Sequence, residues 1–333
     1  MFLFWLAGGG PAAMIQRHLP GFPGSENVLY LMDTWEMPMP RKTIEDFRPE
    51  VLDAFDQYVH GLIDRREFLR RASAFAIGSV TAVSLLEALS PRYAGAEEIR
   101  TDDPRIRTEY VVYPSPRHWQ GYLCRPVRAA GKLPGILVIH ENRGRNPYIE
   151  DVARRFAVAG YLSLAPDALT PFGGWPGNDD EGRALQRKLD PQEMFRNWVA
   201  GFKYLKTHPD CNGRVGAVGF CYGGGVVNQL AVTQPDLDAA VSFYGRQPPL
   251  DEVPNIHAAL LLHYAALDER ITSGAAAYEA ALKKAGVRFQ AYVYEGASHG
   301  FHNNTTPRYK EDAAELAEQR TLAWFDKYLK PPS

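Results

Sequence analysis

The chain has 333 residues, 45% of them hydrophobic, and a formal net charge of −2 at pH 7. This length is enough to bury a large core in one α/β domain with an extension. The near-neutral charge lacks the basic footprint of a nucleic-acid-binding protein, and the sequence contains no Gly-rich phosphate loop or repeat. We therefore expect no nucleic-acid partner.

The three cysteines are scattered along the chain at Cys124, Cys211 and Cys221. Because no C-x-x-C pair is present, a structural zinc site is not expected. A disulfide between Cys124 and Cys211 would require export to an oxidising compartment, and it is kept as an alternative. Two free, buried thiols at these positions are the favoured interpretation.

Residues 1–40 are rich in glycine, proline and methionine and show no sustained hydrophobic period. We interpret them as a product of start-codon choice, with Met37 and Met39 as alternative starts. Residues 48–62 have an amphipathic pattern, which predicts a short helix. Its apolar positions are Val51, Leu52, Phe55, Tyr58, Val59 and Leu62.

Residues 64–96 resemble a twin-arginine export signal. The sequence Asp64-Arg65-Arg66-Glu67-Phe68-Leu69-Arg70-Arg71 precedes a mostly apolar stretch, 72–89, and an Ala94-Gly95-Ala96 site. The resemblance predicts a periplasmic protein that loses residues 1–96. The alternative is a cytoplasmic protein that retains them as a helical extension packed on the catalytic domain. The apolar stretch contains Glu87 and is too short to predict a membrane span.

Residues 97–333 form the second predicted domain, in which strands and helices alternate. Strands are expected at 108–113, 120–125, 136–140, 161–165, 214–220, 239–243, 259–264 and 289–294, and helices at 149–159, 274–285 and 311–329. A loop at 166–178 precedes helical segments that reach residue 208. This alternation predicts an α/β fold with a mostly parallel, doubly wound sheet and helices on both faces. Ligands of such folds bind at the carboxyl ends of the strands.

The sequence Gly219-Phe220-Cys221-Tyr222-Gly223 lies between a predicted strand and a helix-compatible segment. It predicts a nucleophile elbow, a sharp turn that holds one nucleophilic side chain in a strained backbone conformation. The two glycines supply the room that such a turn needs. The alternative is a buried cysteine in a Gly-rich strand-to-helix turn.

Asp268, His299 and Glu141 each follow a predicted core strand. Taken alone, Asp268 suits a turn or helix cap and His299 suits an exposed loop. Together with Cys221 they follow the Cys…Asp…His order of α/β-hydrolases. A carboxylate at position 141 would be costly if it only faced the core, so a polar task is expected. The backbone N–H groups of Asn142 and Tyr222 are the predicted oxyanion-hole donors.

Four motifs carry a resemblance to the dienelactone hydrolase (carboxymethylenebutenolidase) family over about residues 100–330. They are HENRG at 140–144, GFCYGGG at 219–225, LLLHYAALDE at 260–269 and YEGASHGFHN at 294–303. The resemblance implies an α/β-hydrolase fold in which Cys221 is the nucleophile, His299 the base and Asp268 its orienting acid. It also implies that Glu141 contacts the thiol and takes its proton when substrate binds, and that Tyr244 lines the pocket.

One position departs from the family pattern. Members that cleave dienelactone carry an arginine four residues after the catalytic histidine to hold the substrate carboxylate, and this chain has Asn303 there. A neutral amide cannot replace a bidentate guanidinium. The alternative cations are Arg143, Arg145, Arg246, Arg270 and Arg308, each of which also suits an exposed loop.

The residues therefore predict a hydrolase of small-molecule esters or lactones, with an anionic substrate as one option. Attack by Cys221 would give a thioester, and no metal or organic cofactor is required. The alternatives are a general carboxylesterase, a thioesterase or a peptidase-like hydrolase on the same fold. A different class of alternative is a binding protein that keeps the pocket without turnover.

Overall fold

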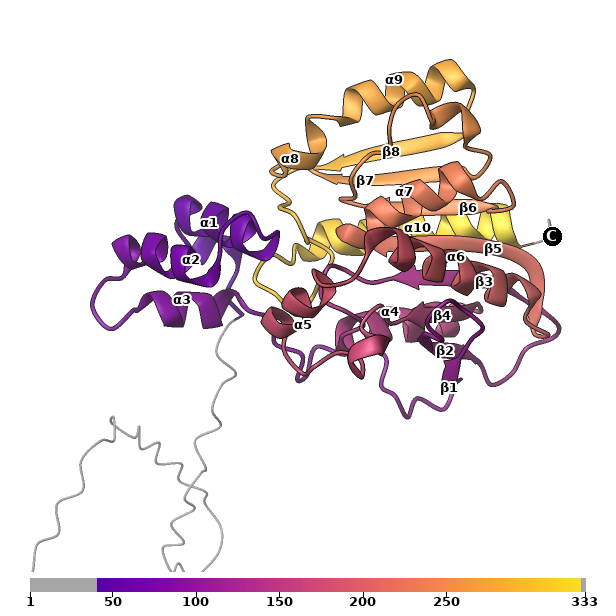
Figure 1. Cartoon of the computed structure of the whole chain (residues 1–333), viewed down its shortest axis with the longest axis horizontal. Coiled ribbons are helices and arrows are strands. Elements are labelled where there is room, and N and C mark those ends of the chain that lie inside the picture. The colour runs from indigo at the N-terminus through magenta and orange to yellow at the C-terminus, as the bar shows by residue number, and fades with distance from the viewer. Residues whose placement is uncertain (1–40, 331–333) are drawn as a thin grey trace, which may run out of the picture. The chain divides into compact units, whose positions relative to one another are not determined.

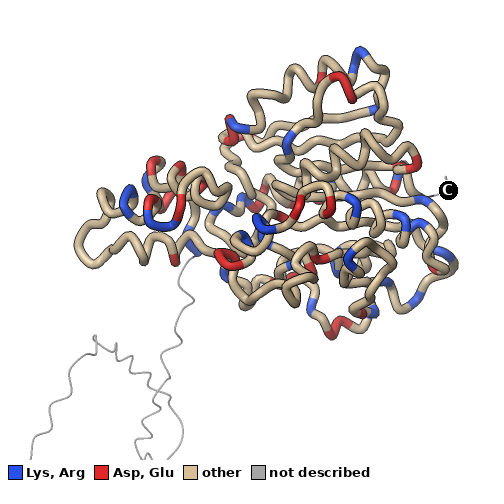
Figure 2. Tube along the Cα trace, in the orientation of Figure 1, with Lys and Arg blue, Asp and Glu red and all other residues tan. Residues whose placement is uncertain are grey.

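The computed structural model describes residues 41–330, so the interpretation of residues 1–40 lies outside the described part of the chain (Figure 1). The described residues, 41–330, belong to one compact unit, which contains both the N-terminal helices and a single sheet. The predicted domain boundary at residue 96 is not tested by this division. Basic and acidic residues are interspersed along the described trace (Figure 2).

The sheet has eight strands in the order β1-β2-β4-β3-β5-β6-β7-β8. β2 runs in the opposite direction to the other seven strands, and all pairs without β2 are parallel. This confirms the predicted, mostly parallel sheet. The strands are β1 Ile106–Val112, β2 Gln120–Pro126, β3 Leu133–Ile139, β4 Leu162–Pro166, β5 Cys211–Phe220, β6 Ala239–Phe243, β7 Ala259–Ala265 and β8 Phe289–Tyr294.

Helices cover both faces of the sheet, because the central strands are apolar on both sides. In β3, Ile136 and Val138 pack into one core, and Leu137 and Ile139 pack into the other. One face is covered by α4 (Pro147–Val158) and α10 (Glu311–Leu329), and the other by α6 (Pro191–Thr207), α7 (Tyr222–Thr233) and α9 (Ala275–Ala285). The short helices α5 (Asp179–Gln186) and α8 (Glu269–Thr272) lie in loops.

Three further helices precede the sheet and have a hydrophobic core of their own. They are α1 (Pro49–Val59), α2 (Arg65–Ala72) and α3 (Ala82–Leu89). Pro49 begins α1 at a position that needs no backbone N–H, and the Asp64 side chain caps α2. The structure confirms the amphipathic helix predicted within 48–62.

The apolar stretch 72–89 is not one helix. A 3₁₀ turn, Ser73–Phe75, and a non-helical segment with exposed Ile77 and Val80 separate α2 from α3. Within residues 41–330, no helix is both long and apolar enough to cross a membrane. Whether this segment directs export stays a prediction.

All three cysteines are free, which confirms the favoured interpretation of Cys124 and Cys211. Both of these thiols are buried, and burial raises their pKa, that of Cys124 to about 12. They are therefore protonated and unreactive at neutral pH.

The turn between β5 and α7 has the predicted strand–turn–helix geometry. Cys221 has a φ of 57°, in the left-handed region that side chains rarely adopt. A Cβ atom at Gly219 would lie 2.2 Å from the Gly223 carbonyl oxygen, and one at Gly223 would lie 2.3 Å from the Ile139 carbonyl oxygen. Only glycine fits either position, so the two residues are required for the turn.

We predict that Gly219→Ala destabilises the fold by about 3 kcal/mol or more, because the new methyl group meets backbone rather than a movable side chain. Urea unfolding measures the change. Gly131→Ala is the matched control, since a Cβ at Gly131 meets nothing within 4 Å. Equal stability of the two variants would contradict the close packing of the turn.

Candidate active site

Five of the predicted residues lie at the carboxyl ends of neighbouring strands. Glu141 follows β3, Cys221 follows β5, Tyr244 follows β6, Asp268 follows β7 and His299 follows β8. Parallel strands present these ends at one edge of the sheet, which is where α/β proteins bind ligands.

Asp268 and His299 form a buried pair at this edge. The Asp268 carboxylate lies 2.5 Å from Nδ1 of His299. Such a contact fixes the ring orientation and leaves Nε2 for other partners. Burial alone would lower the pKa of His299, but the Cys221 thiolate and the Asp268 carboxylate outweigh it and raise this pKa to about 10.

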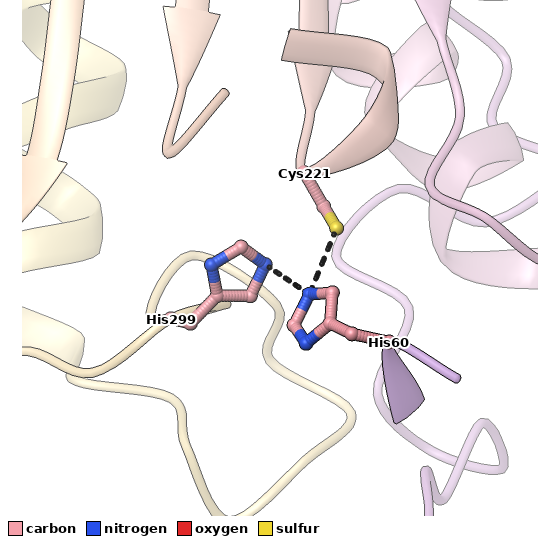
Figure 3. Close-up of side chains that lie close together, drawn as sticks. All are labelled: His60, Cys221 and His299. Atoms are coloured by element: carbon pink, nitrogen blue, oxygen red, sulfur yellow. Dashed lines mark hydrogen bonds between the residues drawn. The ribbon is translucent and has the colours of Figure 1, made fainter. Parts of the chain in front are cut away.

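A second histidine, His60, reaches the same site from the end of α1 (Figure 3). Its Nε2 atom lies 3.5 Å from Sγ of Cys221 and 3.3 Å from Nε2 of His299. The three donor atoms all lie within 4.8 Å of one another. The sequence interpretation assigned no role to His60, because nothing local marks it beyond its place at the end of an amphipathic helix.

His60 is held much as His299 is. Its Nδ1 atom lies 3.2 Å from the Asp56 carboxylate and 2.8 Å from the Asp56 carbonyl oxygen. Burial lowers the pKa of His60, whereas the hydrogen bond to Asp56 and the Cys221 thiolate raise it, and the net direction is upward. Nη2 of Arg270 lies 3.0 Å from Nε2 of His60 and 3.1 Å from Nδ1 of His299.

The two imidazoles lower the pKa of the Cys221 thiol. Burial would raise it, but His299 and then His60 outweigh burial and bring the pKa to about 5. A thiolate is therefore the form present at neutral pH. One thiolate and two imidazoles are also donor types of a transition-metal site, but the Arg270 guanidinium puts a positive charge where such a cation would lie.

Glu141 is buried, and its carboxylate contacts two side chains. Arg143 forms an ion pair with it, and Nδ2 of Asn303 donates a hydrogen bond of 3.2 Å. No hydrogen bond joins Glu141 to Cys221 in residues 41–330, so the thiol contact and proton transfer expected of Glu141 remain predictions. Asn303 is therefore a hydrogen-bond donor to Glu141 in this structure.

The candidate substrate cations lie in different surroundings. Arg143 is buried and also contacts Asp179, at 3.2 Å, whereas Arg246 is exposed. Arg308 is buried, and its Nε and Nη1 atoms have no hydrogen-bond partner among the described residues; the Tyr244 hydroxyl is in the same situation. Buried polar atoms without partners are rare in proteins and point to a ligand.

The predicted oxyanion-hole donors flank this site in sequence. Asn142 follows Glu141, and its side chain donates to the carbonyl oxygen of Val59 at 2.8 Å. Tyr222 begins α7 directly after Cys221. Within residues 41–330, neither backbone N–H donates to another residue, which leaves both free for a substrate oxygen.

Residues 119–329, more than half of the chain, match the family model described as "Dienelactone hydrolase family". The chain belongs to the dienelactone hydrolase family. A "Putative carboxymethylenebutenolidase" of Synechocystis sp. is 31% identical to this chain. The match covers 68% of this chain and 98% of the Synechocystis protein. The "Putative hydrolase fragment YghX" of Escherichia coli is 54% identical over 34% of the chain and 98% of its own length.

A crystal structure described as "Putative Dienelactone Hydrolase", from Klebsiella pneumoniae, has the same fold. Its TM-score is 0.61 at 27% identity, and the match covers 67% of this chain and 99% of the Klebsiella chain. A second family model, described as "YqhI-like", matches residues 39–76. This dienelactone hydrolase family member therefore has an additional matched segment, which includes α1, α2 and His60.

We predict that Cys221 is alkylated as a thiolate with a midpoint near pH 5, instead of the ordinary value of about 8.5. Reactivity is expected above that midpoint and is lost as the pH falls through it. His299→Gln removes the positive charge that stabilises the Cys221 thiolate most, so the alkylation midpoint of Cys221 in this variant shifts upward. The pH dependence of iodoacetamide labelling, located by mass spectrometry, measures both values, and Cys221→Ser is the blank. An unshifted midpoint in His299→Gln would contradict the ion pair.

Proposed function

We propose that this chain hydrolyses carboxylic ester or lactone bonds through a covalent thioester on Cys221. The observation that carries the proposal is a thiol on a strained elbow beside an imidazole whose other nitrogen is held by a buried carboxylate 2.5 Å away. This is the arrangement of nucleophile, base and orienting group that acyl transfer requires.

In the simplest scheme, one histidine does all the proton transfers. His299, oriented by Asp268, keeps Cys221 ionised, and the thiolate attacks the carbonyl carbon. The backbone N–H groups of Asn142 and Tyr222 receive the oxyanion, each worth about 3 kcal/mol in comparable sites. The leaving alkoxide is protonated, and water activated by His299 then hydrolyses the thioester.

The sulfur nucleophile limits the substrates. A thiolate is expelled from the tetrahedral intermediate in preference to a poor leaving group, so activated esters, enol lactones and thioesters are favoured over amides. This argument keeps thioester hydrolysis as the second candidate and disfavours a peptidase.

The surroundings of Arg308 support an anionic substrate. Arg308 and Arg143 both line a cavity of about 220 Å³. Nε and Nη1 of Arg308 have no hydrogen-bond partner among the described residues, and Nη1 lies 3.7 Å from the Asp56 carboxylate. A substrate carboxylate would satisfy both nitrogens through charge-assisted hydrogen bonds. Arg308 would then bind the substrate carboxylate, which the neutral Asn303 amide cannot do in place of the family's arginine.

We predict that Cys221→Ala abolishes turnover of aryl esters, lactones and thioesters, with a loss of at least about 10³-fold, because no other group can form the covalent intermediate. Steady-state kinetics over the panel measure the loss. Cys211→Ser serves as the matched control and is expected to keep wild-type rates. Equal rates in Cys221→Ala and wild type would exclude the thiol mechanism, and ligand binding without turnover by wild type would favour a binding protein.

Arg308→Gln is expected to raise KM for esters that carry a carboxylate by about 10- to 100-fold, the value of one or two hydrogen bonds to a charged group. Neutral esters of similar size should change little. The comparison of KM between the two substrate series measures the effect, and Arg128→Gln, at an exposed position in the loop after β2, provides the control. An equal change for both series would show that Arg308 does not bind the carboxylate.

A further inference from the structure

The N-terminal helices deliver a titratable side chain to the reacting sulfur. His60 lies between Cys221 and His299, with its Nε2 atom in contact with both (Figure 3). The two imidazole rings are nearly perpendicular, at 83°, and their centroids are 4.6 Å apart. The Cys221 sulfur thus has a ring nitrogen of His60 within 3.5 Å, in addition to the imidazole of His299.

We propose that His60, oriented by Asp56, is a second acid–base catalytic residue, and that the helical segment 41–90 is therefore part of the working enzyme. The inference rests on the hydrolase function proposed above. It assigns to His60 the two proton transfers that the single-histidine scheme gives to His299.

The surroundings of His60 hold it in place on every side. Asp56 binds its Nδ1 atom and is in turn approached by Arg308, at 3.7 Å, and Arg270, at 3.9 Å. The preceding residue, Val59, accepts the hydrogen bond from the Asn142 side chain, at the predicted oxyanion loop. The groups in contact with the ring thus come from α1 (Asp56), the elbow (Cys221), α8 (Arg270) and the loop that carries His299.

Two cation–π contacts and a backbone contact extend this attachment. The Arg308 guanidinium lies over the Phe55 ring, and that of Arg183 lies over the Tyr58 ring. Nη2 of Arg41 donates to the Thr306 carbonyl oxygen at 2.8 Å. Phe55 and Tyr58 also belong to the core of the helical segment, so the core that folds α1 also fixes the position of His60.

The proton balance gives His60 a distinct task. His299 already has two partners, because its Nδ1 atom lies 2.5 Å from the Asp268 carboxylate and the Cys221 thiolate raises the pKa of its ring. Nε2 of His60, 3.5 Å from the sulfur, is a second ring nitrogen at the reacting atom. In the resting state the His299 imidazolium stabilises the Cys221 thiolate. His60 is the imidazole to which we assign proton transfer to and from oxygen.

In acylation, the Cys221 thiolate forms the C–S bond and the C–O bond to the leaving group breaks. The His60 imidazolium donates its Nε2 proton to that oxygen, which leaves as an alcohol. Because the Arg270 guanidinium only donates hydrogen bonds, it must move away from Nε2 when His60 is protonated there. In deacylation, neutral His60 takes one proton from water while the water oxygen bonds to the acyl carbon. The C–S bond breaks, the carboxylic acid leaves, and the thiolate and the His60 imidazolium are restored.

The same geometry bears on export. Cleavage after Ala96, as a twin-arginine signal would direct, removes α1 and with it His60. A chain that works by this mechanism retains residues 41–96 wherever it is located. The N-terminal mass of active protein from the producing cell reports on this point, and an active chain that begins near residue 97 would overturn the proposal.

The decisive experiment compares His60→Gln with wild type, both as full chains, over esters whose leaving alcohols differ in acidity. We expect kcat to fall by about 100-fold for alkyl esters, whose leaving group needs a proton. For aryl esters with acidic leaving groups, acylation should survive. A burst of about one alcohol per chain should then precede slow turnover, because deacylation still lacks its base.

Matched variants separate this role from a structural one. His257→Gln changes an exposed histidine and should keep wild-type kinetics. Asp56→Asn, which keeps the His60 ring, should show the same dependence on the leaving group at smaller amplitude, whereas Asp53→Asn on the exposed side of α1 should not. A uniform loss over all esters without a burst, or no loss, would overturn the role of His60.

The alkylation midpoint of Cys221 distinguishes failure of this proposal from failure of the hydrolase function. If wild type turns over no ester, the hydrolase function fails. An upward shift of the midpoint in His60→Gln would then still support the contact between His60 and the thiolate. An unchanged midpoint would overturn that contact as well.

Discussion

The close approach of three backbone segments at the elbow is the constraint on which the rest of the site depends. Gly223 packs against the end of β3 at Ile139, and Gly219 packs against Gly223. This contact holds the strained Cys221 backbone and, at the same time, fixes the loop after β3 that carries Glu141 and Asn142. The proposed nucleophile and the predicted oxyanion donors therefore keep their spacing without any flexible side chain between them.

Charge then decides what the thiol can do. Cys221 is partly buried, and burial alone would keep its sulfur protonated, but two imidazoles, held by Asp268 and Asp56, reverse that preference. Glu141 is neutralised separately by Arg143. A carboxylate in an ion pair does not compete for the thiol proton. In the proposed mechanism the histidines therefore carry out the proton transfers, and Glu141 would take part only if substrate displaced Arg143.

The sequence predicted the sheet well because buried parallel strands are continuous apolar runs, such as 259–264, and their ends show in the turn residues that follow. It also predicted which residues follow the carboxyl ends of these strands, because parallel strands bring those ends to one edge of the sheet whichever side chains they carry. It could not predict the partner of Glu141, because Arg143, Asn303 and Cys221 are all within reach of that edge. His60 was missed for another reason: its contact with Cys221 spans 161 positions, and an amphipathic pattern shows only which face of α1 is buried.

The twin-arginine resemblance and the helical core draw on the same residues. Phe68 and Ala72, which belong to the apolar part of the export pattern, are fully buried between α1, α2 and α3, and Arg70 and Arg71 both pair with Glu67. An amphipathic helix with basic residues on its outer face produces this pattern without any need for export. The burial of these residues is therefore explained by the packing of the three helices. The end of α1 also contacts the thiol through His60, so under the proposed mechanism export would have to leave this contact intact.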